Sequence, residues 1–344
     1  MKIAILTRPD YRSPRVLAET LKPQLQQTSV SIEIFYDINF LNRLVSYRDS
    51  KLSLHFWLKE KLFNYISDKI VIKKLGKFDA VVISECSPNG FVKSLYNVER
   101  FKKIYRNPVL YYEVYYLGNA PSQINKLRKS GDAVMNRYDL HLSVSEITEI
   151  RQQPSGNWFN IGLYAKSWNL TPVPKKEMIA IIDFEHPGYE TYRQMQISAL
   201  QKVGIKYISL EKSYSIEEIR SIYQQGSIYF MQSPEAFGLP ILECLCCGNQ
   251  IFTHSHTWPM SWRLHSNPGF PENDVLPECF TVCSDEEELV ENLSKFKKNY
   301  HPSETPQKVF QNFIRHYPSF YHGNEHELQR LLNVLKAGRM GDNS

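Results

Sequence analysis

Two glutamates separated by seven residues, Glu235 and Glu243, are the side chains of this 344-residue chain best suited to chemistry on a bound ligand. An apolar, aromatic-rich run at 228–231 has the length of a β-strand and is ended by a Ser-Pro pair. Gly238 then permits a tight turn, and Pro240 suits the first turn of a helix that continues to a glycine cap. This pattern predicts Glu235 in a loop at the carboxyl end of a strand and Glu243 on the first turns of the following helix.

A loop and a helix start of this kind can bind an anion and hydroxyl groups together. In an open α/β sheet, ligands bind in the crevice outside the carboxyl ends of the strands. The amino terminus of the helix offers N–H groups and partial positive charge to a diphosphate, while carboxylates accept hydrogen bonds from sugar or ribose hydroxyls. The combination favours a nucleotide sugar as the ligand. The alternative is an ordinary strand-turn-helix unit that carries two surface glutamates.

The segment EAFGLPILECLCCG at 235–248 resembles the E-x7-E segment of retaining glycosyltransferases with the GT-B fold, especially the large fourth sequence family. The resemblance implies an α/β chain of two doubly wound Rossmann-like domains facing across a cleft. It also implies that Glu235 is catalytic and contacts the transferred sugar, and that Glu243 holds the nucleotide ribose. The residues implied to face the donor sugar and its phosphates are Ala236, Phe237, Gly238, Leu239 and Pro240.

The sequence departs from that family where the second domain begins. In the family, the first strand of this domain is usually followed by an arginine and, a few residues later, by a lysine; together they neutralise the leaving diphosphate. Here residues 183–190 read DFEHPGYE. The nearest cation is Arg193, a candidate catalytic counter-charge, and Arg263 is a second candidate on the donor side. No D-x-D motif is present to hold a divalent ion, so we expect catalysis without a metal or other cofactor.

Two histidines and two tryptophans follow the next predicted strand. His254 and His256 lie two residues apart, but a metal site needs at least one more ligand, so ordinary loop histidines are the favoured interpretation. Trp258 and Trp262 are predicted to wall the donor or acceptor pocket, with Trp258 on the donor side.

The composition is that of a globular chain long enough for two domains, with 42% hydrophobic and 22% charged residues. No apolar run reaches the roughly 20 residues that span a bilayer, and the amino terminus has too short an apolar core for a signal peptide. The six cysteines form neither a disulfide framework nor a zinc pattern, because three crowd one predicted helix and Cys279 and Cys283 are not spaced as CxxC. We therefore expect free thiols and a cytoplasmic location.

Charge is distributed unevenly along the chain. The net charge is +5 overall, with +10 in residues 1–172 and −5 in residues 173–344. Residues 39–77 follow a long helical pattern in which apolar positions lie among many lysines and arginines. Such a segment can dock on an anionic membrane, which would suit a lipid-linked acceptor, and peripheral membrane contact is therefore an alternative to a purely cytoplasmic location. Helices that cover a sheet and turn their lysines to solvent explain the same pattern.

Alternating strand and helix patterns predict a domain division near a polar, proline-bearing segment at 169–177. We expect an amino-terminal, acceptor-side Rossmann-like domain over 1–170 and a nucleotide-sugar-binding domain over 171–322. The remaining residues, 323–344, are predicted to form a helix that returns toward the first domain and ends in a frayed tail.

Charged residues at predicted strand ends of the first domain are candidates for acceptor binding. Glu85 and Glu113 each follow an apolar strand, and Arg8, Arg12 and Arg15 lie in or near the loop after the first strand. In related folds such loops form the acceptor side of the cleft. The two carboxylates are therefore candidate acceptor contacts and the arginines, Arg12 in particular, candidate anion contacts; exposed loop charge is the competing explanation.

The predicted function is transfer of a sugar from a nucleotide-diphosphate sugar to a hydroxyl of a glycan, a lipid-linked acceptor or a small molecule, with retention and without a divalent metal. Nucleic acid is not an expected partner, and the oligomeric state is left open. The alternative is a GT-B-like partner subunit that binds nucleotide or glycan but has lost catalysis, which the missing Arg/Lys pair favours. A GT-B epimerase or phosphorylase is a third class, for which no distinguishing motif is present.

Overall fold

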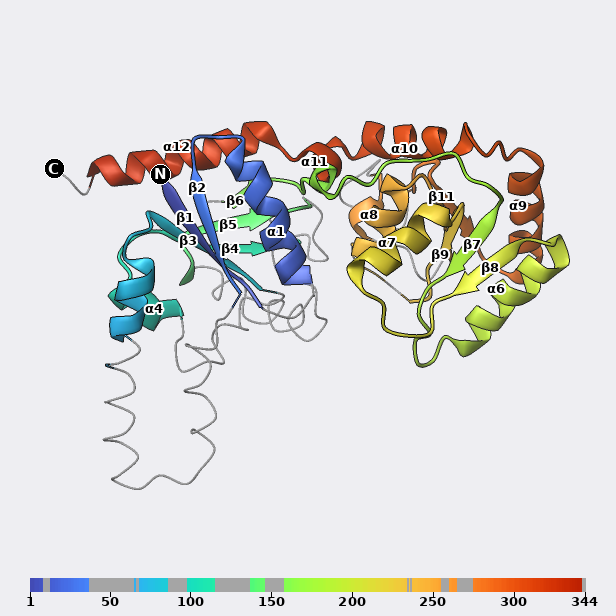
Figure 1. The fold of residues 1–344 in the computed structure, drawn as a ribbon, viewed down its shortest axis with the longest axis horizontal. Coiled ribbons are helices and arrows are strands. Elements are labelled where there is room, and N and C mark those ends of the chain that lie inside the picture. The colour runs from blue at the N-terminus through green and yellow to red at the C-terminus, as the bar shows by residue number, and fades with distance from the viewer. Residues whose placement is uncertain are drawn as a thin grey trace, which may run out of the picture. The chain divides into compact units, whose positions relative to one another are not determined.

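The computed structural model describes residues 1–8, 13–36, 65, 68–85, 98–114, 137–145, 158–233, 235, 237–254, 260–264 and 275–341. The chain divides into two compact units (Figure 1). Unit 1 comprises Met1–Tyr164 and His322–Ser344, and unit 2 comprises Ala165–Tyr321. The last helix, α12 (Glu325–Gly341), thus belongs to unit 1. The predicted fold class, two Rossmann-like α/β domains, is confirmed by the parallel sheet in each unit.

Unit 1 is built on a parallel sheet with six strands among its described residues. Apolar runs form these strands, and every residue of β3 and β4 is buried, as expected for parallel strands covered on both faces. In spatial order the strands are β2 (Ser31–Phe35), β1 (Lys2–Leu6), β3 (Ala80–Ser84), β4 (Val109–Glu113), β5 (Leu140–Ser143) and β6 (Trp158–Asn160).

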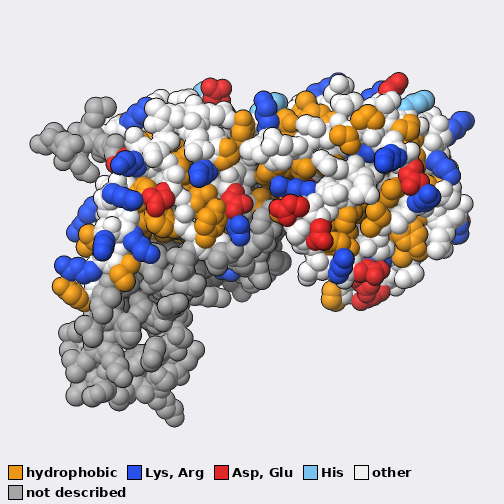
Figure 2. Space-filling model, viewed as in Figure 1, with side chains coloured by type: hydrophobic (Ala, Val, Ile, Leu, Met, Phe, Trp, Pro, Cys, Tyr) orange, Lys and Arg blue, Asp and Glu red, His pale blue; other side chains and the backbone are white. Residues whose placement is uncertain are grey.

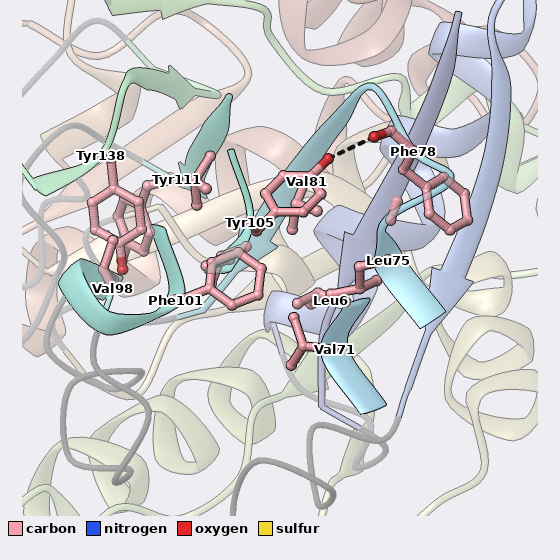
Figure 3. Close-up of a cluster of buried hydrophobic side chains, with 13 residues drawn as sticks. Leu6, Val71, Leu75, Phe78, Val81, Val98, Phe101, Tyr105, Tyr111 and Tyr138 are labelled. Atoms are coloured by element: carbon pink, nitrogen blue, oxygen red, sulfur yellow. Dashed lines mark hydrogen bonds between the residues drawn. The ribbon is translucent and has the colours of Figure 1, made fainter. Parts of the chain in front are cut away.

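Helices cover both faces of the unit 1 sheet. On one face, α4 (Val98–Ile104) and the helical residues 68–75 bury Phe101 and Leu75 against strand side chains such as Tyr111, as Figure 3 shows. In the same cluster the Tyr105 hydroxyl donates a hydrogen bond to the Phe78 carbonyl at 2.9 Å. The helix α1 (Ser13–Gln26) contacts β2, β3 and β4 and buries its own apolar residues, among them Val16, Leu17, Leu21 and Leu25.

The helical residues 68–75 combine a buried apolar side with exposed lysines. Val71 and Leu75 are fully buried, whereas Lys69, Lys73 and Lys74 are exposed. Figure 2 shows Lys and Arg side chains gathered around this helix and α4. This part of the basic segment therefore has the character of a helix that covers a sheet. Most of the segment, 39–64, lies outside the described residues, and membrane contact stays a prediction.

Unit 2 has a second parallel sheet, with five strands among its described residues. In spatial order the strands are β11 (Phe280–Cys283), β10 (Gln250–His254), β9 (Ile228–Phe230), β7 (Ile179–Ile182) and β8 (Lys206–Ser209). The helices α6 (Glu190–Val203) and α9 (Glu286–Lys298) pack on the face that carries Phe230, and α7 (Ile216–Gln225) packs on the face that carries Tyr229. A further helix, α8 (Leu239–Cys246), contacts α7 and β10.

Close packing against α10 (Thr305–His316) explains the glycine that follows α8. Gly248 has a φ of +77°, and a Cβ atom there would lie 2.4 Å from the Pro306 carbonyl oxygen. Glycine adopts this backbone conformation without strain, and it alone leaves room for the neighbouring helix because it has no Cβ atom. The short helix α11 (Pro318–His322) and the 3-10 turns η3 (Ala165–Trp168) and η4 (Met260–Trp262) complete the described elements.

A buried lysine joins the carboxyl ends of α7 and α8. Lys175 Nζ donates hydrogen bonds to the carbonyl oxygens of Gln224, at 2.7 Å, and Cys247, at 3.0 Å. Carbonyl groups in the last turn of a helix have no partner within the helix and carry partial negative charge, so they favour a cation. Burial lowers the pKa of the Lys175 amine, and its side chain is 6% exposed.

The five cysteines among the described residues are buried and free. Burial raises the pKa of their thiols above the ordinary value, so these thiols stay protonated and unreactive at neutral pH. Cys86 lies outside the described residues. Within the described chain, no helix has both the length and the apolar character needed to cross a membrane.

Candidate functional site

The topology of unit 2 places the two predicted glutamates beside a point where strand order reverses. From β7, the chain first adds β8 on one side of the strand and then β9 on the other. Ligands of such sheets bind outside the carboxyl ends of the two strands that flank this switch point. Here those ends lead into Asp183, after β7, and into the segment from Met231 to Gly238, after β9.

Gly238 forms the turn that starts α8. Its φ is +69°, and an added Cβ atom would lie 2.7 Å from Ile241 Cδ1, so a larger residue would strain the turn. Gly238 is the residue before the first helical position, and no side chain among the described residues caps the helix there. The N–H groups at this helix start can therefore serve an anionic ligand. The predicted donor contacts Leu239 and Pro240 are half-buried at the same place.

An aromatic cluster packs against the loop that precedes α8. The Phe237 ring is buried and stacks on Trp262 with 5.4 Å between ring centroids, and the Trp262 indole N–H donates to the Phe237 carbonyl. Trp262 is fully buried, so the prediction that it walls a ligand pocket is wrong. It instead supports the loop, together with its aromatic neighbours Phe280, Phe313, Tyr317 and Phe320.

Glu235 shares the switch point with a second carboxyl group. Its side chain reaches solvent, but surrounding protein atoms desolvate the carboxyl group and raise its pKa to about 7, with a further contribution from the charge of Asp183. Asp183 accepts hydrogen bonds from the Tyr229 hydroxyl and the Phe184 N–H, yet burial raises its pKa as well. Sequence reasoning did not single out Asp183; its position directly after an apolar strand was the available signal.

Glu243 is held by an arginine that sequence reasoning also missed. Arg220 Nε donates to Glu243 Oε1 at 2.9 Å, and Arg220 Nη2 lies 2.8 Å from the same oxygen. The guanidinium also lies over the Trp168 ring, 5.3 Å from its centroid. Burial raises the pKa of Glu243, whereas the Arg220 charge and hydrogen bond lower it. The pair links the second turn of α7 to the second turn of α8.

The start of α6 differs from the start of α8, because the chain's own carboxylate occupies it. The Gly188 N–H donates to both carboxylate oxygens of Glu190, each at 3.0 Å, and this lowers the pKa of Glu190. A phosphate at this place would meet like charge. Beside this helix, on the α6 side of the sheet, lies a cavity of about 690 Å³ whose wall includes Tyr189, Tyr192 and His254.

The two predicted counter-charges have different surroundings. Arg193 is 4% exposed and directs its guanidinium to the carbonyl oxygens of Asp183 and Leu210, so it ties together the carboxyl ends of β7 and β8. Arg263 is half-buried just after η4. Binding of a diphosphate by either arginine stays a prediction, as do the roles of Ala236 and Trp258, which lie outside the described residues.

The acceptor-side candidates lie at the carboxyl ends of unit 1 strands. Glu85 follows β3 and accepts from Arg8 Nε at 2.8 Å. Glu113 is the last residue of β4, not part of a loop, and it is 1% exposed. The Tyr111 hydroxyl and the Val114 N–H both donate to the Glu113 carboxylate at 3.0 Å, but burial raises its pKa to about 8. Arg12 lies outside the described residues.

The described residues contain no group of three or more His, Cys, Asp or Glu side chains that could hold a metal ion. His254 Nε2 is 2.8 Å from the Ser284 carbonyl oxygen, and its ring meets Tyr192 edge to face. His256 lies outside the described residues, and whether the protein works without a metal stays a prediction.

Two parallel α/β units, each with its strand order reversed beside its first strand, define the GT-B fold. The chain is similar to the Anabaena protein HepE, solved in complex with UDP-glucose, with 12% identity, a TM-score of 0.55, and coverage of 98% of this chain and 100% of that chain. It is also similar to a putative UDP-N-acetylglucosamine 2-epimerase from Listeria monocytogenes, with 10% identity, a TM-score of 0.56, and coverage of 99% and 97%.

A third similar structure is the catalytic domain of starch synthase IV from Arabidopsis thaliana, bound to ADP and acarbose. The identity is 10%, the TM-score 0.54, and the coverage 96% of this chain and 98% of that chain. No protein-family model and no curated protein sequence matches the chain. At these identities the likeness shows the fold alone, and this fold carries both transferases and an epimerase.

Proposed function

We propose that this protein is a glycosyltransferase that takes a sugar from a nucleotide-diphosphate sugar and transfers it, with retention, to an acceptor hydroxyl. One observation carries the proposal: at the β7/β9 switch point, a helix start that no described side chain caps lies in the same short segment as Glu235 and the arginine-held Glu243. Diphosphate, sugar and ribose require such a set of N–H donors and carboxylate acceptors.

Each part of the site has a proposed role. The N–H groups at the start of α8 bind the diphosphate, and the ionised Glu243 accepts hydrogen bonds from the ribose. Glu235 contacts the transferred sugar as positive charge develops at its anomeric carbon. With a pKa of about 7, Glu235 is present at neutral pH in both protonation states, so it can accept or donate a hydrogen bond to a sugar hydroxyl.

The proposal also covers the acceptor contacts, the absence of a cofactor and the location of the protein. Glu85, Glu113 and Arg12 are proposed acceptor-side contacts for a glycan, a lipid-linked acceptor or a small molecule. The proposed reaction needs no metal or other cofactor, because the fixed N–H groups at α8, with Arg193 or Arg263, are proposed to balance the leaving diphosphate. We propose a cytoplasmic location, with peripheral membrane contact through the basic segment as the alternative.

Calorimetry with UDP-, GDP- and ADP-sugars tests the proposal, followed by an assay for nucleotide release. We expect one nucleotide to bind and its sugar derivative to be turned over when an acceptor is present. Binding without sugar release to any acceptor would favour a catalytically impaired partner subunit. Absence of binding by every nucleotide would overturn the proposal.

Variants of the two glutamates separate their roles. Glu243→Ala should weaken nucleotide and nucleotide-sugar binding alike, by about 1.5–3 kcal/mol for one charged hydrogen bond. Glu235→Gln should lower turnover and leave free nucleotide binding nearly intact, because it acts on the sugar in the transition state. Equal losses of nucleotide affinity in both variants would show that the roles are assigned to the wrong residues.

A further inference from the structure

We infer that Arg220 is a positioning residue for nucleotide recognition, because it orients Glu243 so that the carboxylate distinguishes a ribonucleotide from a nucleotide without ribose hydroxyls. This inference rests on the proposed function, and it assigns a role to a residue outside the E-x7-E segment. Arg220 lies on α7, 23 residues before Glu243. It acts on the ligand through Glu243.

The contact geometry gives Arg220 control over the orientation of the Glu243 side chain. Its Nε and Nη2 atoms both contact Oε1, at 2.9 and 2.8 Å, so neither contact uses Oε2. Two N–H groups of a planar guanidinium on one oxygen restrict rotation of the carboxylate. The second oxygen is thereby fixed in direction as an acceptor, at the second turn of a helix whose start lies at the switch point.

The Trp168 ring restrains the position of the Arg220 guanidinium. The guanidinium carbon lies 5.3 Å from the centroid of the Trp168 ring, a distance at which a cation is attracted to the aromatic face. Arg220 has 22% of its side chain exposed, and Glu243 has 9%. An arginine held between an indole and a carboxylate does not need to reorganise when a ligand binds, which favours preorganised recognition.

The electrostatics show why a neutral side chain could not replace the arginine. Burial raises the pKa of Glu243, and Arg220 is the group that lowers it. Among the described residues, the other titratable groups that interact with Glu243 are Tyr223, Cys244, Cys246 and Cys247, and the pKa of each is raised, so all four are neutral near pH 7. Without Arg220, the buried carboxyl group would take up a proton at higher pH and lose acceptor capacity.

The test compares Arg220→Met, which keeps the apolar stem, with Arg220→Lys, which keeps the charge. The probes are UDP, GDP or ADP, chosen to match the nucleotide sugar that binds in the calorimetric panel, and the 2′,3′-dideoxy analogue of that nucleotide, each titrated from pH 6 to pH 9. We expect the wild type to prefer the ribonucleotide by about tenfold or more, the size of one charged hydrogen bond. In Arg220→Met this preference should fall toward unity at the low end of this pH range and recover as the pH rises, because the loss of Arg220 raises the pKa of Glu243 further.

Arg220→Lys should retain part of the preference and little of the pH dependence. The matched control is Lys202→Met, which removes a cation from an exposed pair with Glu286 in the same unit and should leave the preference unchanged. If Arg220→Met weakens both nucleotides by the same factor at every pH, Arg220 is only structural and the inference is overturned. Circular dichroism of each variant checks that the fold is retained.

A second measurement needs no ligand and therefore separates failure of this inference from failure of the proposed function. The pKa of Glu243, followed by carbon NMR of labelled glutamate, should be higher in Arg220→Met than in the wild type, and Arg220→Lys should lie between them. An unchanged pKa would overturn the inference even if nucleotides bind. A raised pKa in a protein that binds no nucleotide would support the Arg220–Glu243 coupling and count against the nucleotide site.

Discussion

The switch point of unit 1 lies between β1 and β3, and that of unit 2 lies between β7 and β9. In unit 1 the residues that follow these strands include Arg8 and Glu85, which form an ion pair at 2.8 Å. In unit 2 they include two carboxyl groups, Asp183 and Glu235, and the pKa of each is raised. The same strand order therefore marks the same position in both sheets, while residue type decides whether opposite charges pair there or two carboxyl groups lie near each other.

The largest expected effect concerns the aromatic cluster that packs against the Glu235 loop in unit 2. Trp262→Ala should lower the free energy of unfolding by about 3–5 kcal/mol, because it removes a fully buried aromatic side chain and leaves a cavity. Urea unfolding followed by circular dichroism measures the change. Phe184→Ala, which removes a side chain that is 37% exposed, is the control and should lower stability by clearly less, because part of that ring is already in contact with water. Equal losses would show that the cluster does not support the loop.

A buried carboxyl group in unit 1, one strand away from its switch point, should contribute strongly to the pH dependence of stability. The pKa of Glu113 is about 8, above its value in the unfolded chain, so its stabilising contribution is complete at low pH and is lost as the pH rises through 8. Between pH 5 and pH 9 this loss should be on the order of 3 kcal/mol. Glu113→Gln should flatten the profile in urea titrations at pH 5, 7 and 9. A variant with the wild-type slope would place the titrating group elsewhere.

One isosteric substitution tests the electrostatic coupling between Asp183 and Glu235 in unit 2. Asp183→Asn removes a negative charge near Glu235, so the pKa of Glu235 should fall from about 7. It should stay above the ordinary value because burial, the larger cause, is unchanged. Carbon NMR titration measures it, with Glu185→Gln as a control that removes an exposed carboxylate from the same loop. A Glu235 pKa that is unchanged in Asp183→Asn would contradict the coupling of the two groups.

The ion pair of unit 1 should matter least for stability. Glu85 is 6% exposed, but Arg8 is 42% exposed and Gln keeps a polar side chain at position 85, so Glu85→Gln should lower the free energy of unfolding by only about 1 kcal/mol, and salt should reduce the difference. Chemical denaturation at low and high ionic strength measures this. Glu33→Gln, which removes a more exposed pair with Lys77, should have a still smaller effect. A loss greater than about 2 kcal/mol would mean that the pair is not the solvent-screened contact described.

The strands and the helix start at α8 were predictable because their signals are local. A run such as 2–6 is apolar and short, and Gly238 with Pro240 marks the end of a turn and the start of a helix in any context. A local signal also marks the start of α9. Asp285 caps this helix by accepting from the Glu288 N–H at 2.8 Å, in the spacing that marks helix starts.

The contacts that define the candidate site could not be predicted, because they join residues distant in the sequence. Arg220 meets Glu243 only because α7 and α8 pack side by side. Glu113 was expected in a loop open to an acceptor, but it ends β4 and is satisfied by Tyr111 and Val114. Arg193 was identified only as the nearest cation to the donor site, and its hydrogen bonds to carbonyl groups at two strand ends were not foreseen. Such partners depend on tertiary packing, not on local pattern.

The Lys175 ammonium group binds the carboxyl ends of both α7 and α8. If either helix frayed at its carboxyl end, Lys175 would keep a buried charge with only part of its hydrogen bonds, which raises the free energy of opening that helix alone. The two helices should therefore open together, and their amide protons should exchange with solvent as a single cooperative unit. Arg220 lies on α7 and Glu243 on α8. The distance between the two side chains should therefore stay constant while neighbouring loops move.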